Sequence, residues 1–173
     1  MERQFVNANF KYIRVIPLDN GVTWSIEQIC NKISTTYRAL NLNCVVIVWL
    51  DREGRDETAE QIREQIYQAL INLGAEPQNI RIMVCDRMTE NVILADEQVI
   101  SDLFQLEAYE YAHEGKNGKH ILKEFYKSHN INYKEMKEGV ALLKRIRLDR
   151  ASQKSASVAR FRADWNGDCW WFA

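Results

Sequence analysis

The most constraining feature of this sequence is an apolar run that ends abruptly in acidic residues. Residues 44–50 read Cys-Val-Val-Ile-Val-Trp-Leu, and Asp51, Arg52, Glu53 and Gly54 follow directly. A short apolar run that is rich in β-branched residues and closed by a turn signal is typical of a buried strand in a parallel sheet. The run therefore predicts an α/β fold in which a central strand ends at two carboxylates.

Patterns on both sides of this run extend the prediction to alternating strands and helices. Strands are expected over residues 10–18 and 79–85, and helices over about 25–40 and 56–73, where apolar residues recur every three or four positions. Gly74 is expected to end the second helix. This order predicts parallel strands, flanked by the helices that connect them.

The second part of the chain favours helices and one long loop. Thr89 is placed to cap a helix over residues 90–95, and the polar stretch 107–118 predicts a surface loop. Further helices are expected over residues 97–106, 119–127, 134–146 and 158–165. We therefore predict an α/β core over residues 1–106 and a helical part over residues 107–173 that packs on it, as a single domain overall.

Acidic residues follow two of the expected strands. Asp51 and Glu53 end the central strand, and Asp86 ends the next one. The carboxyl ends of parallel strands share one rim, where open α/β sheets bind their ligands. Carboxylates two residues apart point the same way on a strand and can share a divalent ion, here Mg²⁺ or Mn²⁺. The alternative is that Asp51 caps the next helix and Glu53 is solvated.

Charge is unevenly distributed along the chain. Residues 1–114 hold 10 Lys and Arg against 18 Asp and Glu, and residues 115–173 hold 13 against 6. Either the basic part binds phosphates beside an acidic metal site, or the two parts attract each other as they pack. Ser155 and Ser157 precede a helix, where they could bind an anion or serve as a plain N-cap. The candidate nucleic-acid ligands are Lys137, Arg145, Arg147, Arg150, Ser155, Ser157 and Arg160.

Several protein classes are disfavoured by absent motifs. The sequence contains no P-loop, no dinucleotide-binding glycine motif, no GxSxG and no HExxH. Its four cysteines include no CxxC pair, its first residues lack the apolar segment of a signal peptide, and its longest apolar run is too short for a membrane span. These features predict a cytoplasmic protein with reduced thiols that does not insert into a membrane.

Four segments, taken in order, resemble one protein family. They are Asp51-Arg-Glu53, the stretch from Thr89 to Asp96, the stretch from Tyr133 to Gly139, and Leu148-Asp followed by the serine-rich stretch that ends at Phe161. This order and spacing resemble a family of small bacterial Toprim-like proteins of uncharacterised function. Members of the family are often encoded beside ABC-type ATPases in phage-defence systems.

The resemblance implies a metal-dependent phosphotransfer fold. Asp51 and Glu53 match the Asp-x-Asp magnesium pair of Toprim domains, with Glu at the second position. The Glu-Gly that supplies the general acid/base after an early strand is absent from this sequence. Either the chain starts after that strand, or Asp19 or Glu90 takes the role. The resemblance also implies a protein partner, an ABC-type ATPase.

Three functions follow as hypotheses. The first is a Mg²⁺- or Mn²⁺-dependent nuclease, or a nuclease-like subunit of an anti-phage defence system, that acts on DNA or RNA. Its catalytic residues would be Asp51, Glu53 and Glu90, and its metal ligands Asp51, Glu53 and Asp86. The second is a non-catalytic Toprim-like module that docks on an ATPase or effector, which the aromatic residues 170–172 favour. The third, weaker one is an enzyme acting on nucleotide phosphate esters.

Overall fold

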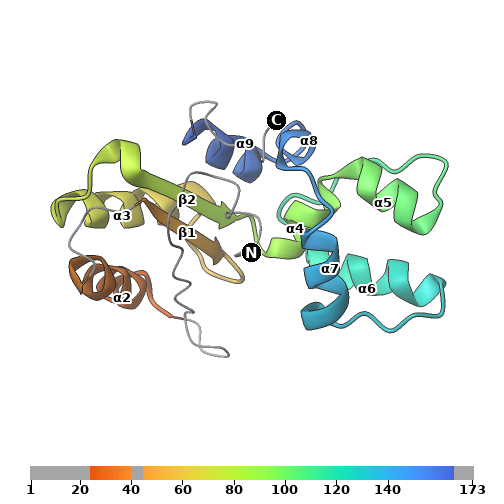
Figure 1. The fold of residues 1–173 in the computed structure, drawn as a ribbon. Coiled ribbons are helices and arrows are strands. Elements are labelled where there is room, and N and C mark those ends of the chain that lie inside the picture. The colour runs from red at the N-terminus through yellow and green to blue at the C-terminus, as the bar shows by residue number, and fades with distance from the viewer. Residues whose placement is uncertain (1–23, 40–44, 166–173) are drawn as a thin grey trace.

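The computed structural model describes residues 24–39 and 45–165, and a pair of parallel strands lies at its centre. Strand β1 (Val46–Asp51) pairs in parallel with strand β2 (Ile80–Cys85), so that Asp51 lies beside Cys85. Helix α3 (Ala59–Asn72) and a 3-10 turn η1 (Pro77–Asn79) connect the two strands (Figure 1). The described residues thus form an α/β structure with a small two-stranded parallel sheet. The strand expected over residues 10–18 lies outside them.

Local sequence signals define both ends of α3. The Thr58 hydroxyl accepts a hydrogen bond from the Gln61 backbone N–H, and the Gln61 side chain accepts one from the Thr58 N–H, which completes a capping box. Gly74 lies just beyond the helix with a φ of +88°, a left-handed conformation that costs glycine little. The expected end of this helix at Gly74 is therefore confirmed.

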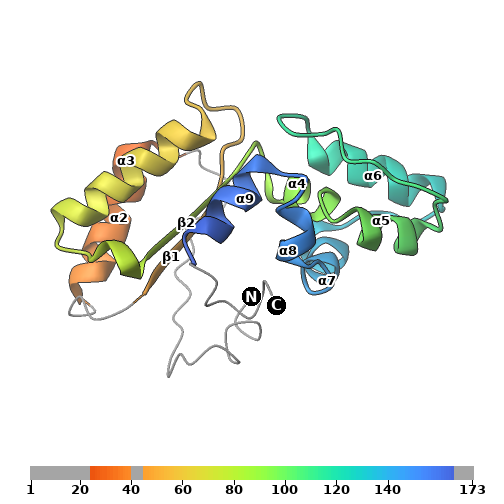
Figure 2. The same cartoon turned by 90° about the horizontal axis from the view of Figure 1, so that it is seen from above.

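The two faces of the sheet are covered by different helices. Even-numbered residues of both strands pack against α2 (Ile26–Ala39) and α3, and odd-numbered residues pack against α9 (Ala156–Ala163). On the α9 side, the rings of Trp49 and Phe161 meet edge to face, with their centroids 5.9 Å apart. Figure 2 shows the sheet between α9 and the α2–α3 pair. Burial on both faces explains why the central strand is almost wholly apolar.

The remaining helices extend the molecule beyond the carboxyl ends of the strands (Figure 1). In chain order they are α4 (Thr89–Leu94), α5 (Glu97–Phe104), α6 (Gly118–Ser128), the π-helical turn η2 (Glu135–Gly139), α7 (Val140–Leu143) and α8 (Leu148–Ala151). Their apolar side chains share one core with α9 and the odd-numbered strand residues. None of the helices in residues 24–39 and 45–165 combines the length and the apolar character that a membrane span needs.

Two details of this helical part differ from the sequence-based expectation. The helix expected over residues 134–146 starts with the π-helical turn η2 and ends at Leu143. Helix α8 was not expected, and it occurs because buried Asp96 binds the residues around its first turn. The Asp96 carboxylate accepts the Arg147 backbone N–H at 2.7 Å and both the Nε and a terminal nitrogen of Arg150 at 2.8 Å. A partner distant in sequence therefore fixes the position of α8 relative to α5.

Candidate functional site

The loops that leave β1 and β2 lie side by side. The backbone N–H of Arg52 donates to the Cys85 carbonyl at 3.2 Å, and that of Glu53 donates to the Arg87 carbonyl at 2.6 Å. Glu53 has a φ of +55° and Arg87 has a φ of +83°, a region that non-glycine residues rarely adopt. Such backbone conformations cluster at functional sites, where the surrounding structure holds them in place. Two of them occur here at adjacent strand ends.

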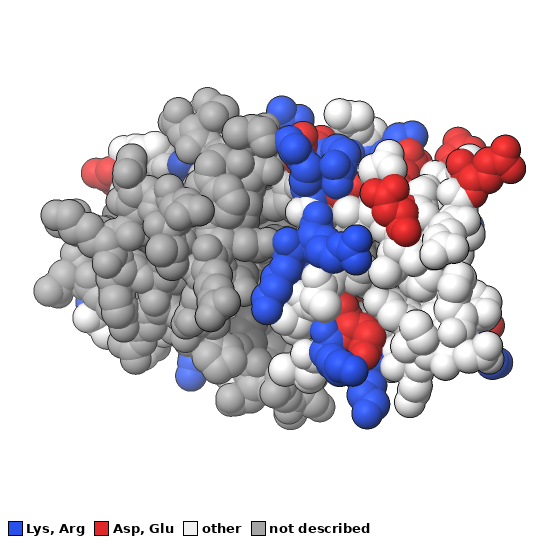
Figure 3. Space-filling view, turned by 45° about the vertical axis from the view of Figure 1, so that its right-hand side comes forward, with Lys and Arg blue, Asp and Glu red and all other residues white. Residues whose placement is uncertain are grey.

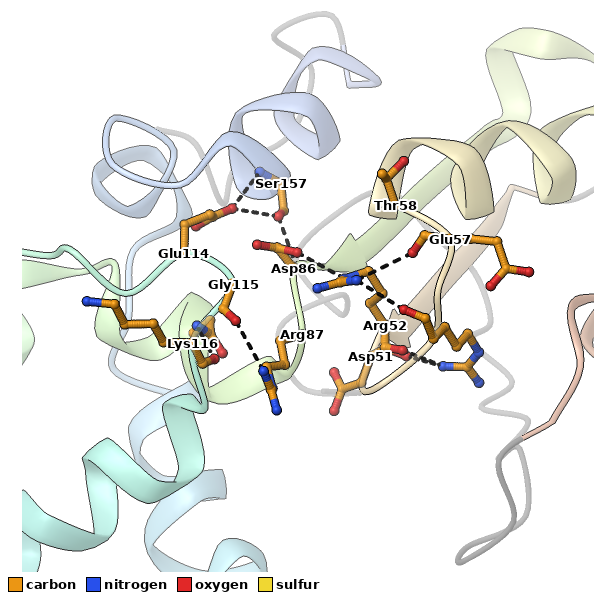
Figure 4. Close-up of polar contacts among 12 residues, drawn as sticks. Asp51, Arg52, Glu57, Thr58, Asp86, Arg87, Glu114, Gly115, Lys116 and Ser157 are labelled. Atoms are coloured by element: carbon orange, nitrogen blue, oxygen red, sulfur yellow. Dashed lines mark hydrogen bonds and ion pairs between the residues drawn. The ribbon is translucent and has the colours of Figure 1, made fainter.

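Two arginines hold the loop after β1 in shape. The Arg52 guanidinium pairs with the Asp86 carboxylate at 3.1 Å and also donates to the carbonyls of Arg55 and Glu57. The Arg55 guanidinium donates to the Asp51 carbonyl at 2.8 Å and to the Arg52 carbonyl at 2.9 Å. Figure 4 shows the side chains of Asp51 and Asp86 pointing away from each other. Asp86 is thus engaged by Arg52 and does not share one site with Asp51.

Asp51 is held by a hydrogen-bonded chain that starts on its own strand. The Trp49 indole N–H donates to the Thr89 hydroxyl at 3.0 Å, and that hydroxyl donates to Asp51 Oδ1 at 2.7 Å. Burial raises the pKa of Asp51, although the bond from Thr89 opposes the effect. The expectation that Thr89 caps α4 was wrong, because Met88 occupies the N-cap position and the threonine hydroxyl is bound to Asp51.

Glu90 lies near Asp51 and is buried, with 8% of its surface exposed. The Tyr133 hydroxyl donates to Glu90 Oε1 at 3.2 Å. Burial raises the pKa of Glu90, and the charge of Asp51 raises it further. The charge of the exposed Glu53 likewise contributes to raising the pKa of Asp51. Asp51, Glu53 and Glu90 therefore form one group of interacting carboxylates, which we call the acidic rim.

A lysine interacts with the charges of this rim. Lys119, in the first turn of α6, forms an ion pair with Glu135. Hydrogen bonding to Glu135 raises the pKa of Lys119, and the charges of Glu90 and Glu53 add to the effect. Sequence reasoning did not select Lys119, Tyr133 or Thr89 as site residues. For Lys119 the available signal was its place after Gly118, next to the loop expected over residues 107–118.

The acidic rim suits a hard divalent cation in its chemistry. Its donors are all carboxylate oxygens, the ligands that Mg²⁺ and Mn²⁺ prefer. Among residues 24–39 and 45–165, no three His, Cys, Asp or Glu side chains are grouped closely enough to hold a metal ion. Mg²⁺ commonly needs only one or two protein carboxylates, because water and substrate phosphates complete its octahedron. Asp51 and Glu53, with Glu90 beside them, fit that pattern, whereas Asp86 is paired with Arg52.

Several of the residues considered for nucleic-acid binding are already paired with acidic groups. Arg150 binds Asp96, Arg147 binds Asp149 with a closest contact of 3.0 Å, and Arg160 lies 3.4 Å from Glu60. The Lys137 side chain is 82% exposed and lies 3.4 Å from Glu138, and Arg145 is also exposed. Figure 3 shows Lys and Arg side chains gathered in a band across one face, with acidic side chains beside them.

Two serines at the start of α9, Ser155 and Ser157, bind a carboxylate of the same chain. Ser155 is the N-cap of α9, as the plainer interpretation expected. Glu114 Oε1 accepts hydrogen bonds from the Ser157 hydroxyl at 2.9 Å and the Ser155 hydroxyl at 3.2 Å, and Tyr111 donates to Oε2 at 2.8 Å. Ser157 Oγ also accepts the Asp86 backbone N–H at 3.1 Å (Figure 4). These contacts tie the loop before α6 to the end of β2.

Comparisons of the chain with protein-family models, with curated proteins and with solved structures found no match.

Proposed function

We propose that this protein is a Toprim-like, Mg²⁺-dependent nuclease or nuclease-like subunit that cleaves phosphodiester bonds at the acidic rim. One observation carries the proposal: the Asp51 carboxyl group lies at the carboxyl end of β1, held by Thr89 and close enough to Glu53 and Glu90 for their charges to interact. Carboxylates that raise one another's pKa become favourable neighbours when a cation lies between them.

The rim residues take distinct roles in this proposal. Asp51 and Glu53 would hold Mg²⁺ or Mn²⁺, which when bound polarises a phosphate oxygen and makes a water molecule more acidic. Glu90 is buried, has a raised pKa and accepts a hydrogen bond from Tyr133, so it is suited to exchange a proton as the general acid/base. This assignment supplies the acid/base function of the Glu-Gly motif, since no Glu-Gly pair precedes Asp51 in the sequence.

The proposal also covers substrate and partner. Among the basic residues considered for DNA or RNA, Lys137 and Arg145 are the candidates that we retain, because the Lys137 side chain is 82% exposed and Arg145 is also exposed. An ABC-type ATPase as partner, and a role in anti-phage defence, rest on the family resemblance alone.

Calorimetric titration with Mg²⁺ and Mn²⁺ tests the metal site directly. We expect the wild type to bind one of these ions, and Asp51→Ala/Glu53→Ala to lose that binding while it stays folded. Asp102→Ala/Glu107→Ala is the matched control, because it removes the same charge from exposed positions elsewhere. A wild type that binds would next be tested for metal-dependent cleavage of labelled single- and double-stranded DNA and RNA. A folded wild type that binds neither ion would contradict the proposal.

A second candidate is a non-catalytic interaction module of the same fold. The observation in its favour is that Glu114 already binds the two serines at the start of α9, while Arg147, Arg150 and Arg160 pair with acids of the same chain. Arginines that are paired with acids of the same chain contribute less positive charge to the binding of nucleic acid. Absence of metal binding, together with stable binding to an ATPase or effector, would favour this candidate over the nuclease.

A further inference from the structure

The start of α6 is fixed tightly against the start of α4. The Lys119 backbone N–H points at the Met88 sulfur at 3.2 Å, and the Asn117 side chain caps the helix by accepting the His120 N–H at 3.0 Å. A Cβ atom on Gly118 would lie 2.7 Å from Asn91 Oδ1 and 2.8 Å from the Asn91 backbone nitrogen. Only glycine fits at such a distance from the backbone. This contact brings the start of α6, and with it residue 119, close to α4, the helix that carries Glu90.

The Lys119 ammonium group is accessible although it has a partner. Its side chain is 37% exposed, and that of its partner Glu135 is 52% exposed. An ion pair with this exposure is weak, because water screens both charges. The ammonium also interacts with the charges of Glu90 and Glu53 across the rim. The Lys119 ammonium thus lies at the edge of the acidic rim, and its ion pair with Glu135 can be exchanged for a contact with another anion.

From this geometry we propose that Lys119 binds the phosphate group of the substrate, exchanging Glu135 for a phosphate oxygen. The proposal rests on the proposed function, because it names the group that orients the phosphate at the same site. Three carboxylates repel a phosphodiester that approaches them, and a cation besides the metal offsets part of that repulsion. A lysine ammonium has three hydrogen-bond donors, so it can contact a phosphate while it stays near the rim.

Inorganic pyrophosphate is a suitable probe, titrated by calorimetry into the full chain in the presence of saturating Mg²⁺. We expect Lys119→Met to weaken pyrophosphate binding by about tenfold or more, the usual effect of losing a charge-assisted hydrogen bond. Methionine keeps the length of the side chain and removes only the charged donor. Lys123→Met removes an exposed charge from the same helix and should change the affinity less than about twofold.

A substitution of Glu135, the ion-pair partner of Lys119, should change pyrophosphate affinity in the opposite direction. Glu135→Gln frees Lys119 from its ion pair and should tighten pyrophosphate binding, whereas a variant that is merely destabilised would weaken it. Glu124→Gln, an exposed residue of α6, controls for the loss of one negative charge. Circular dichroism of every variant checks that the fold is intact.

Separate titrations with Mg²⁺ alone distinguish this inference from the proposed function. We expect Lys119→Met to bind Mg²⁺ at least as tightly as the wild type, because the substitution removes a cation from the rim. Equal pyrophosphate affinities of the wild type and Lys119→Met, or no pyrophosphate binding by the wild type, would overturn the role of Lys119 and leave the metal site standing. Lys119-dependent pyrophosphate binding with no Mg²⁺ binding would keep the phosphate contact and overturn the metal-dependent function.

Discussion

The hydrogen bond between Thr89 and Asp51 shows how a single contact between residues distant in sequence can define a site residue. Threonine near the start of a helix is a common N-cap, and nothing within its own segment indicates that its hydroxyl is bound elsewhere. Its acceptor lies 38 residues earlier and its donor, the Trp49 indole, lies on the same strand as that acceptor. Sequence patterns identified Asp51 correctly as the end of a strand. They could not identify Thr89, because its role depends on how the start of α4 meets the end of β1.

Replacing Thr89 by valine tests this chain of hydrogen bonds. The substitution leaves the Trp49 N–H without its acceptor and Asp51 without its closest donor, so we expect unfolding free energy to fall by about 1–3 kcal/mol. Mg²⁺ affinity should also fall, because the Asp51 carboxylate is no longer oriented. Urea unfolding and calorimetry measure the two effects. The control is Thr35→Val, an exposed threonine whose hydroxyl bonds only within α2; an equal loss in this control would contradict the prediction.

The raised pKa values of Asp51 and Glu90 predict how stability depends on pH. The unfolded chain releases these protons near 3.8 and 4.5, and the folded protein releases them at higher pH. Between the unfolded and the folded pKa values, the folded state binds more protons than the unfolded chain. The free energy of unfolding therefore falls as the pH rises through this range, and the loss of stability persists at higher pH. In the metal-free protein, Asp51→Asn/Glu90→Gln should therefore be more stable than the wild type at neutral pH.

Urea unfolding across this range measures the difference. The advantage of the double variant should shrink as the pH falls from the raised pKa values of the folded protein towards those of the unfolded chain, and it should be lost below about 4, where the carboxyl groups of both states are protonated in the wild type. Asp102→Asn/Glu107→Gln provides the control, since it removes two exposed carboxylates outside the rim. A double variant that is less stable than the wild type at neutral pH would show that the carboxylates contribute favourable contacts instead.

At the scale of helices and strands, the sequence predicted elements with strong periodicity and missed those that depend on distant partners. The central strand was expected over residues 44–50 and is observed over Val46–Asp51. Helix α3, which follows that strand, ends at Gly74 as expected. Both signals are local: an apolar run and a glycine. The π-helical turn η2 has no such signal, because Gly139 packs against the Tyr133 hydroxyl, which in turn binds Glu90. Helix α8 likewise depends on Asp96, about fifty residues earlier in the chain.

Gly118 offers a test of the contact between α4 and α6. An added Cβ would meet the Asn91 backbone nitrogen at 2.8 Å, and a backbone atom cannot move aside as the end of a side chain can. We expect Gly118→Ala to cost about 1–3 kcal/mol of stability, as overpacking does, and to weaken pyrophosphate binding by displacing Lys119. Gly54→Ala is the matched control, because nothing lies within 4 Å of its added methyl group. Thermal unfolding in which the two variants behave alike would contradict this account.

For the whole molecule, the uneven charge of the sequence has a structural use that does not require nucleic acid. Acidic residues of the first part pair with basic residues of the second, as Asp96 does with Arg150, Glu97 with Lys154 and Glu60 with Arg160. From the charge distribution alone, mutual attraction and phosphate binding were both open as explanations. The pairs support the first for these residues, while Lys137 and Arg145 stay candidates for the second. Charge along a chain could not separate the two uses, because it does not indicate which partners meet.

This division between structural and binding residues leads to a paired prediction. Arg150→Ala leaves the fully buried Asp96 carboxylate without its guanidinium, so we expect a loss of about 1–3 kcal/mol of stability. Lys137→Ala/Arg145→Ala alters exposed side chains and should change stability by less than about 0.5 kcal/mol per residue.

If the protein binds nucleic acid through Lys137 and Arg145, only this second variant should reduce the dependence of affinity on salt, since that slope counts phosphate contacts. Thermal unfolding and the binding of a fluorescent single-stranded oligonucleotide at several salt concentrations measure both quantities. A reduced salt slope for Arg150→Ala in a fully folded protein would instead assign Arg150 to the binding surface, and would mean that its ion pair with Asp96 opens when nucleic acid binds.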